Sequence, residues 1–511
     1  MAHPSVHNLD ARVRVWEQRW EDICNLYLPL VVEGSIWRYR RPADADDPDC
    51  GWKLHISATV LNASSILKRI APVLVRQAVQ FKAARSLAEI YKLNSGLYYN
   101  YTQIGKVITI YPRDENQAVA LAAQLHRLTQ RFKGPSVPFD FRFAAGSNIY
   151  YRFGAFRPLH LEQRDGRRIS ALSSPTGELV PDSRVEAKPG WVSNPFETKT
   201  PTRKKRGRVP EVPFRVLRAL VQRGKGGVYE AIDLRTSPPQ RCLLKEGRSN
   251  GEVAWDGRDG AWRVRNEGRV LSALSACGAN VPEVYGAFVL SGNYYLAMKY
   301  LDGQTLHNYL IALERRLSLA RILDYGIQLA TFLSVIHRAG WVWRDCKPKN
   351  ILISRGELLP IDFEGACPIE HLPALRWGTR GFISPYSRGD FDNSPLDDDL
   401  YGLGAILYLL ITGRVFDAAQ PVTIPRLRAG IPDELVEIVE RLLRTVAGKR
   451  PDAATTGSQL EKLLTVMNRE RASRRRLSLG AQMKRSTGRI QRQFEISRQG
   501  HEAGIGSNAI E

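Results

Sequence analysis

The sequence predicts an α+β multidomain protein. Its 511 residues are enough for roughly two to four domains, and its hydrophobic content of 43% and charged content of 25% are typical of globular proteins. Short stretches in which apolar and polar residues alternate, as in strands, are interspersed with stretches at helical spacing. A proline-rich, basic stretch over residues 186–213 separates a shorter N-terminal part from a longer C-terminal part.

The N-terminal part, residues 1–185, is expected to form a mixed α/β domain. Its clearest strand covers residues 51–58, where apolar residues alternate with Lys53, His55 and Ser57. Lys53 and His55 are two residues apart, so their Cα atoms should lie about 7 Å apart on one face of the strand. Helices are expected at residues 13–32, 62–80 and 117–132, and further strands at residues 107–111, 139–142 and 149–153.

Basic side chains gather in or beside these expected strands rather than on the helices. A pocket lined by them would bind a phosphate group, because Arg offers paired hydrogen bonds and Lys a point charge. A Lys that lies near other cations has a lowered pKa and can serve as a base. On spacing alone, solvated surface charges are the better interpretation, since charged residues mostly face water. The residues concerned are Lys53, His55, Lys82, Lys106, Arg142 and Arg152.

Four short motifs resemble the N-terminal domain of class III and class IV lanthipeptide synthetases, which is similar to the bacterial effector phosphothreonine lyases: residues 52–57, 81–82, 105–106 and 150–154. The resemblance implies a phosphothreonine-lyase-like α/β domain that eliminates phosphate from phosphorylated Ser or Thr, leaving dehydroalanine or dehydrobutyrine. It implies that Lys53 removes the α-proton and that His55 protonates the departing phosphate. It also implies that the phosphate is held by Lys82, Lys106, Arg142 and Arg152.

Two stretches outside the expected domains are basic. Residues 186–213 are expected to be a mobile linker, because five prolines interrupt them; their cationic run at residues 202–208 is better explained as solvated than as a patch for nucleic acid or a leader peptide. Residues 469–511 are dense in Arg and Lys and are expected to be disordered or a lone helix. The net charge of +22 suits a phosphopeptide and an acidic leader better than nucleic acid, for which no binding motif is found.

Residues 340–365 carry the clearest catalytic pattern of the chain. Asp345, Lys347 and Asn350 precede a short apolar run, and a second apolar run ends in Asp362. Phosphoryl transfer needs this set of groups. Asp345 would accept the proton of a substrate hydroxyl and Lys347 would neutralise charge on the moving phosphoryl group, while Asn350 and Asp362 would hold Mg²⁺. The alternative, a surface carboxylate in a hairpin turn, does not explain the order and spacing of all four residues.

The same segment resembles the catalytic loop and the Asp-Phe-Gly motif of protein kinases. It departs from the usual pattern in two places, since Trp343 stands where kinases have a His and Glu364 precedes Gly365. Both departures are similar to the forms found in lanthipeptide synthetases. The resemblance implies a bilobal protein-kinase-like fold over residues 214–468 that uses ATP, or another nucleoside triphosphate, with Mg²⁺.

Upstream residues resemble the nucleotide site of protein kinases. A strand, a Gly-rich turn and a second strand are expected over residues 214–231, where glycines would let the backbone approach phosphate. Lys245 has the position of the kinase lysine. Glu267 is its expected ion-pair partner, in a helix that opens at Asn266, and Met298 is expected near the adenine. The turn residues expected at the nucleotide are Gly224, Gly226, Gly227 and Val228.

One further departure from the kinase pattern, at Tyr386, leaves two alternatives open for the partner of Arg450. Tyr386 replaces the Glu that ends the activation segment of protein kinases. Arg450, the expected partner of that Glu, has therefore either lost its carboxylate or found another one.

The sequence shows no feature of an exported or membrane-spanning protein. Residues 1–21 lack the apolar core of a signal peptide, and no apolar run reaches the length of about 20 residues that spans a bilayer. The six cysteines form no C-x-x-C pair and are expected to be reduced thiols of a cytoplasmic protein. Residues 469–511 contain no Cys, so the third, cyclase domain of lanthipeptide synthetases is not expected here; a separate cyclase would close rings, or the product stays as dehydroamino acids.

These features together predict a bifunctional dehydratase. The kinase half would phosphorylate Ser or Thr of a precursor peptide, and the lyase half would then eliminate the phosphate. The first alternative is a signalling Ser/Thr protein kinase whose N-terminal domain only binds phosphopeptide. The second is a catalytically weak scaffold. Two features fit it: counted back from Val228, only Gly226 keeps the usual three-glycine spacing of the Gly-rich turn, and Tyr386 replaces the usual Glu.

Overall fold

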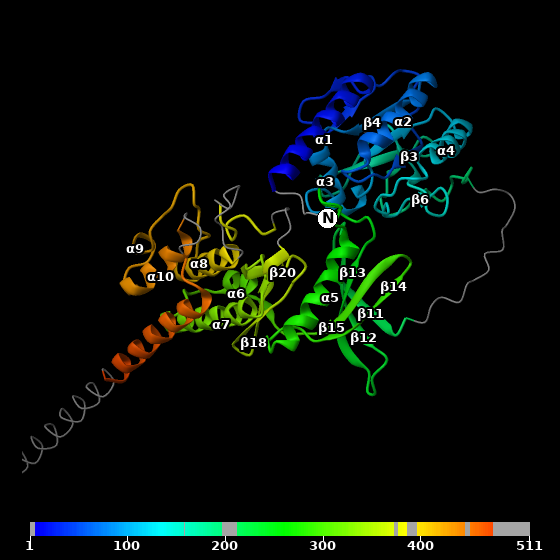
Figure 1. Cartoon of the computed structure of the whole chain (residues 1–511). Coiled ribbons are helices and arrows are strands. Elements are labelled where there is room, and N and C mark those ends of the chain that lie inside the picture. The colour runs from blue at the N-terminus through cyan, green and yellow to red at the C-terminus, as the bar shows by residue number, and fades with distance from the viewer. Residues whose placement is uncertain are drawn as a thin grey trace, which may run out of the picture. The chain divides into compact units, whose positions relative to one another are not determined.

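The computed structural model describes residues 6–157, 159–196, 212–371, 377–385, 396–444 and 450–473 (Figure 1). The chain divides into two compact units. The first unit contains residues 1–303, 339–345 and 360–378, and the second contains residues 304–338, 346–359 and 379–511. Tyr386, the basic run at residues 202–208 and most of the basic tail lie outside the described residues, so the statements about them stay predictions.

A seven-stranded antiparallel sheet forms the centre of the N-terminal domain. Its strand order is β1-β2-β4-β5-β3-β7-β6. The alternation predicted for β3 is confirmed, because Leu54 and Ile56 are fully buried in the core shared with α2 and α4 while Lys53 and His55 face the other side. The elements are β1 (Leu30–Val31), β2 (Trp37–Tyr39), β3 (Cys50–Ile56), β4 (Gln80–Ala84), β5 (Ile108–Tyr111), β6 (Phe141–Arg142), β7 (Ile149–Ala155), α1 (Val6–Tyr27), α2 (Ala63–Arg76), α3 (Leu87–Ser95) and α4 (Glu115–Thr129).

Polar side chains cap the starts of α3 and α4. The Ser86 hydroxyl accepts a hydrogen bond from the N–H of Glu89 at the start of α3, and the Asp114 carboxylate accepts one from Gln117 at the start of α4. Gly96 ends α3 with a left-handed φ of 62°. The chain then passes through the short helix η1 (Tyr101–Gln103) on its way to β5.

The packed N-terminal domain continues past residue 185, where the linker was expected to begin. A three-stranded sheet follows, made of β8 (His160–Glu162), β9 (Arg168–Ser173) and β10 (Leu179–Pro181). The chain then returns to the large sheet, where the ring of Phe196 stacks on that of Tyr151 with centroids 3.8 Å apart. Residues 186–196 therefore belong to the packed domain rather than to a mobile linker.

The first unit also holds a five-stranded antiparallel sheet with the order β11-β12-β13-β15-β14. Its helix α5 starts earlier than the predicted position, Asn266. The side chain of Asp259 caps it by accepting a hydrogen bond from the N–H of Trp262 at 2.8 Å. The elements are β11 (Phe214–Gln222), β12 (Gly226–Asp233), β13 (Gln240–Gly247), α5 (Gly260–Ala276), β14 (Val284–Leu290), β15 (Asn293–Lys299), β17 (Trp341–Val342), β20 (Cys367–Pro368) and η3 (Ile369–His371).

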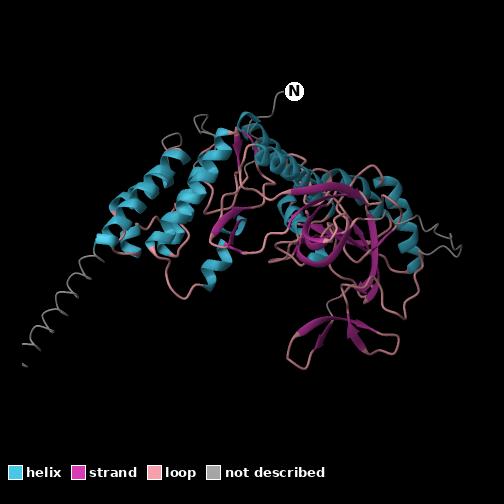
Figure 2. Cartoon of the chain, turned by 90° about the horizontal axis from the view of Figure 1, so that it is seen from below, coloured by secondary structure: helices cyan, strands magenta, loops and turns pink. Residues whose placement is uncertain are grey.

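The second unit is mainly helical in its described part, whereas most strands belong to the first unit (Figure 2). Among the described residues, α7 (Leu319–Arg338) is the one helix that is long and apolar enough to cross a membrane, and half of its apolar window is buried inside the protein. It packs against α8 (Asp397–Thr412), as a core helix would. The other elements are β16 (Gln304–Thr305), α6 (Leu306–Ala312), η2 (Pro348–Asn350), β18 (Ile351–Ser354), β19 (Glu357–Pro360), α9 (Ile424–Leu427), α10 (Asp433–Leu443) and a helix over residues 453–473.

Candidate active sites

Most of the predicted cations of the N-terminal domain share one face of the seven-stranded sheet. On this face Lys53 of β3 lies opposite Arg152 of β7, and His55 lies opposite Thr109 of β5. Thr109 is in turn opposite Lys82 of β4. Directly opposed residues of neighbouring strands project to the same side. The strand register therefore collects side chains that are far apart in the sequence.

A cavity of about 350 Å³, here called the cationic pocket, lies on this face. Arg142 is not among its lining residues, because Arg142 lies on the edge strand β6 and donates to the Ser136 hydroxyl at 2.9 Å and to the Tyr150 hydroxyl. The other five predicted residues all line the pocket: Lys53, His55, Lys82, Lys106 and Arg152. Residues that the sequence did not single out line it too, among them Tyr99, Asn100, Gln103, Tyr111, Asp182 and Arg184.

Asp140, which the sequence analysis missed, joins two of the predicted residues. Its carboxylate oxygens lie 2.6 Å from His55 Nδ1 and 2.9 Å from Lys106 Nζ, and its side chain is fully buried. Burial opposes ionisation of Asp140, but His55 and Lys106 outweigh that effect and lower its pKa to about 2. Because Asp140 engages Nδ1, the ring nitrogen left for a substrate is Nε2. The only sequence sign of Asp140 was its two-residue spacing from Arg142.

Burial shifts the pKa values of the basic groups in the pocket downward. It lowers the pKa of His55 to about 4, against the opposing effect of Asp140, so the imidazole is uncharged near pH 7. It lowers the pKa of Lys53 to about 7 and that of Lys82 to about 8, and the nearby charge of Arg184 adds to both shifts. At neutral pH a large fraction of Lys53 is therefore an uncharged amine, the form that can accept a proton.

The remaining charges of the pocket differ in how firmly they are held. Arg152 is 5% exposed, and its Nη2 donates to Asp182 at 2.6 Å and to the carbonyl oxygen of Ser183 at 2.9 Å. Arg184 is exposed and lines the same pocket. The ammonium of Lys82 lies 4.5 Å from the centre of the Trp37 ring. A phosphate group that enters the pocket would thus meet an anchored Arg152 together with three further cations, Lys53, Lys82 and Arg184, which form no ion pair within the described part of the chain.

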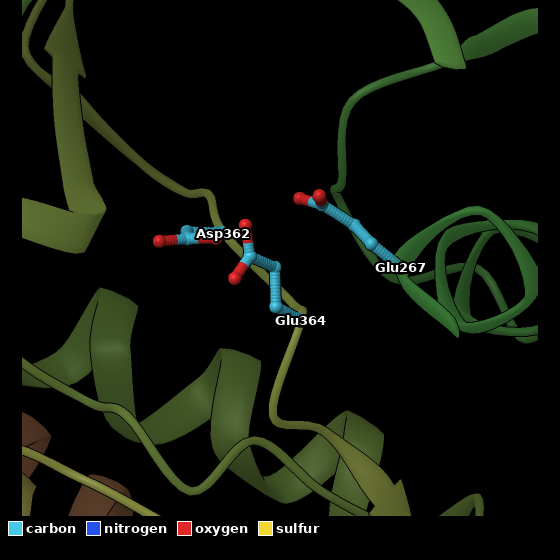
Figure 3. Close-up of side chains that lie close together, drawn as sticks. All are labelled: Glu267, Asp362 and Glu364. Carbon is cyan, nitrogen blue, oxygen red and sulfur yellow. The ribbon is translucent and has the colours of Figure 1, made fainter. Parts of the chain in front are cut away.

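A second candidate site, also in the first unit, is a buried cluster of four charged residues, whose three carboxylates are drawn in Figure 3. Lys245 Nζ lies 2.8 and 2.7 Å from the two carboxylate oxygens of Glu267, 3.0 Å from Asp362 Oδ1 and 4.0 Å from Glu364 Oε1. Burial disfavours the charged amine, but the three carboxylates outweigh it and raise the pKa of Lys245. The predicted ion pair between Lys245 and Glu267 is confirmed.

The same carboxylates suit a divalent cation. Ligand oxygens of Glu267, Asp362 and Glu364 lie within 4.8 Å of one another, and Mg²⁺ prefers oxygen ligands. Asp362 has the most exposed side chain of the three, at 31%, so it is best placed to meet a cation that arrives with a nucleotide. Asn350, the other predicted ligand, belongs to the second unit, where it is buried at the end of η2.

The Gly-rich turn between β11 and β12 is held on two sides. Lys225 Nζ lies 2.5 Å from Glu364 Oε2. The N–H of Gly224 donates to the carbonyl oxygen of Ser95, at the end of α3, at 2.9 Å. A Cβ atom at position 224 would lie 1.6 Å from the carbonyl oxygen of Asn94, so glycine is required for this close approach. The end of α3, rather than the predicted phosphate, therefore lies beside Gly224 in this structure.

The strands next to this turn carry the other predicted nucleotide residues. A Cβ atom at Gly226 would lie 1.7 Å from the carbonyl oxygen of Glu246, and Gly227 follows it in β12. Val228 pairs with Lys245 across β12 and β13. The last predicted residue, Met298 of β15, is 3% exposed and pairs with Leu243 of β13.

Trp343, the departure from the usual His, connects the two motifs of the predicted catalytic segment. Its indole Nε1 donates to the carbonyl oxygen of Asp362 at 3.2 Å, and its ring stacks on Phe363 with centroids 5.5 Å apart. Arg344 and Asp362 both adopt left-handed φ values, 69° and 64°. Such backbone is costly outside glycine and concentrates at functional sites. Asp345, the predicted proton acceptor, follows Arg344 directly.

In the second unit, Lys347 and Arg450 both have defined partners. Lys347 Nζ donates to the Thr379 hydroxyl at 2.8 Å. Arg450 lies 2.9 Å from Asp397 and donates to the Ser384 hydroxyl at 3.2 Å. Of the two alternatives left open by the sequence, Arg450 has therefore found another carboxylate.

The chain is similar in sequence to two kinds of known protein. A protein named "Probable SapB synthase" from Streptomyces coelicolor is 32% identical over 70% of this chain and 39% of its own length. The serine/threonine-protein kinase PknA of Mycobacterium tuberculosis is 30% identical over 47% of this chain and 57% of its own length. The chain thus spans less than two thirds of either relative. A weak match to the solved PknI kinase domain of Mycobacterium tuberculosis, at 20% identity and a TM-score of 0.39, covers 49% of this chain and 95% of the solved chain.

Two family models match the chain. Residues 30–208 match the RamC N-terminal domain, and residues 224–485, just over half of the chain, match the protein kinase domain. One match falls mainly on the N-terminal part of the chain and the other on the C-terminal part. Together with the SapB synthase relative, they confirm the predicted resemblance of this chain to lanthipeptide synthetases. This chain belongs to the protein kinase family and carries a RamC-type N-terminal domain in front of its kinase domain.

Proposed function

We propose that this protein dehydrates Ser or Thr residues of a peptide in two steps, phosphorylation followed by elimination of the phosphate. The observation that supports the second step most is the pocket in which Lys53, with a pKa of about 7, lies on the same sheet face as the His55–Asp140 pair. A kinase domain in the same chain supports the first step. A phosphorylated side chain brings nearly two negative charges, which a cationic pocket can capture.

In the elimination step, uncharged Lys53 takes the α-proton of the phosphorylated residue. The electron pair of the Cα–H bond forms the Cα=Cβ bond, and the Cβ–O bond breaks as phosphate leaves. Burial keeps the imidazole of His55 uncharged near pH 7, but a bound phosphate dianion raises its pKa by opposite charge. The imidazolium, stabilised by Asp140 at Nδ1, then gives its proton to the departing phosphate.

In the phosphorylation step, side chains of the kinase domain would position the nucleotide and the substrate hydroxyl and would neutralise charge on the transferred phosphoryl group. Lys245, held by Glu267, would bind nucleotide phosphates, and Mg²⁺ at Asp362 would neutralise charge on the transferred group. Asp345 would accept the proton of the substrate hydroxyl, and Lys347 would stabilise the moving phosphoryl group. Asn350 would be the second Mg²⁺ ligand.

The proposal is tested by following the mass of a Ser-rich candidate peptide incubated with the protein, ATP and Mg²⁺. A transient gain of about 80 Da, from phosphate, should give way to a net loss of about 18 Da, from water. A peptide synthesised with phosphoserine and supplied without ATP should lose phosphate directly. If both peptides bind and the phosphoserine peptide stays intact, the lyase half of the proposal is wrong.

The second candidate function is a signalling Ser/Thr kinase whose N-terminal domain only binds phosphopeptide. The similarity to PknA favours it, although that similarity covers 47% of the chain. Phosphorylation without water loss, together with tight binding of the phosphopeptide to residues 1–196 within the full chain, would be its signature.

Elimination should depend on pH through both Lys53 and His55. Lys53 acts as a base only when it is unprotonated, and its pKa is about 7, whereas His55 donates a proton only after a bound phosphate has raised its pKa. The kcat profile on the phosphoserine peptide should therefore be bell-shaped, with a rising limb as Lys53 of the complex loses its proton and a falling limb at higher pH as His55 loses its own. Rates at a series of pH values and constant ionic strength check this, and a kcat that does not change with pH would exclude these acid and base roles.

Replacing Asp140 with Asn should slow elimination by roughly 10²-fold, because an amide cannot stabilise the protonated His55 or balance Lys106. The effect should fall on kcat more than on KM, since Asp140 acts through His55 rather than on the peptide. Asp165→Asn, in an exposed turn between β8 and β9, is the matched control. An unchanged kcat in Asp140→Asn would contradict the positioning role.

A further inference from the structure

A second cavity, here called the flanking cleft, opens beside the cationic pocket. This flanking cleft has a volume of about 590 Å³, which is within the range of cavities that bind ligands. It shares five lining residues with the cationic pocket: Lys53, Lys82, Tyr111, Asp182 and Arg184. The two cavities therefore adjoin at these residues, and a peptide that places its phosphate in one is close enough to reach the other.

The far wall of the flanking cleft is mostly apolar. Leu30 and Val32 come from β1 and the turn after it, Pro48 from the loop before β3, and Phe156 and Leu159 from the segment between β7 and β8. Val32 is 48% exposed, although a side chain of this kind gains from being covered. These residues offer contact area to an apolar side chain.

The charged side chains of that wall are already engaged. Arg41 lies 2.6 and 2.7 Å from the two carboxylate oxygens of Asp47. Arg157 donates to the carbonyl oxygens of Asp44 and Asp47 at 2.6 and 3.0 Å. The lining of the cleft thus changes from cations that form no ion pair among the described residues, at the shared wall, to ion-paired charges and apolar groups elsewhere.

We propose that the flanking cleft binds an apolar side chain of the substrate peptide near the phosphorylated residue. The inference rests on the proposed lyase function and names a sequence preference for it. In an extended peptide, alternate side chains point the same way about 7 Å apart. Both cavities share one wall, so the apolar side chain should lie two residues from the phosphoserine, on one side of it.

The test uses synthetic phosphoserine peptides and no ATP, so that the kinase half plays no part. Leu, Gly or Asp is placed at the second position before or after the phosphoserine, and kcat/KM for elimination is measured with the full chain. For one of the two positions, Leu should exceed Gly and Asp by about tenfold, the discrimination usual for an apolar pocket. A Leu placed next to the phosphoserine should give a smaller gain.

Two variants that change residues of the flanking cleft, and one control variant that changes an adjacent residue outside it, make the test specific. Val32→Asp and Leu159→Ala should each reduce the preference for Leu, the first to near unity. Val31→Asp changes the adjacent residue, which is 42% exposed and does not line the cleft, and should keep the preference intact. Equal elimination of all peptides would overturn the subsite while leaving the lyase function standing. Absence of elimination from every bound peptide would overturn the lyase function and the subsite together.

Discussion

Replacing Asp345 with Asn is expected to lower peptide phosphorylation by about 10²–10⁴-fold, because an amide cannot accept the proton of the substrate hydroxyl. The reaction is best followed in a protein that also carries His55→Ala, so that phosphate stays on the peptide and can be counted. The initial rate of phosphate transfer from labelled ATP is the measurement. The hydrogen bond from Trp343 to the Asp362 carbonyl oxygen does not involve the side chain at 345, so this contact should survive.

Asp324→Asn is the matched control for that experiment. Asp324 lies in α7 with its side chain 41% exposed, and it accepts hydrogen bonds from Arg321 and Gln328 of the same helix. Its rate should stay within about twofold of the parent, as is usual for surface substitutions. Comparable thermal unfolding of both variants shows that folding is retained. Wild-type phosphorylation by Asp345→Asn would remove Asp345 from the role of proton acceptor.

Replacing His55 with Ala should stop the reaction at the phosphorylated peptide. Loss of the group that protonates the leaving phosphate should slow elimination by about 10²–10⁴-fold, while phosphorylation continues. A stable adduct of about 80 Da should therefore accumulate in the mass spectrum where the wild type gives water loss. The same variant should still bind the phosphoserine peptide, because Lys53, Lys82 and Arg152 remain in the pocket.

The control for this variant is His126→Ala. His126 lies on α4, contacts the Ser147 hydroxyl at 3.0 Å and is not among the residues that line the cationic pocket. It should eliminate phosphate at the wild-type rate. If His55→Ala converts phosphopeptide as fast as the wild type, the proton for the departing phosphate has another source and His55 has only a structural part.

Local pattern predicted much of the N-terminal domain and its pocket. The two-residue alternation of β3 gave both its buried face and the shared side of Lys53 and His55, because a strand has a strict period of two. Spacing alone could not show that Lys82, Lys106 and Arg152 would join them. That depends on which strands become neighbours, and the order β4-β5-β3-β7 is set by packing over the whole domain.

What the sequence missed are contacts between distant segments. Asp140 binds His55 across 85 positions of sequence, and Lys225 binds Glu364 across 139. A single carboxylate or ammonium in a loop has no periodicity that could reveal its partner. The prediction for Arg142 was wrong for a different reason. Its strand was predicted correctly, but β6 is the edge strand of the sheet, and Arg142 does not line the cationic pocket.

The segment after α3 links the two candidate sites of the first unit. The carbonyl oxygens of Ser95 and Gly96 accept hydrogen bonds from Gly224 and Arg223 of the Gly-rich turn, whereas Tyr99, Asn100 and Gln103, a few residues on, line the cationic pocket. The N-terminal domain should therefore be difficult to transfer to another kinase, because the kinase domain must match the contacts at the end of α3. A chimera that joins it to another kinase would need a glycine at the position of Gly224 to accept α3, and a graft that lacked one would disturb the lyase and kinase halves at the same time.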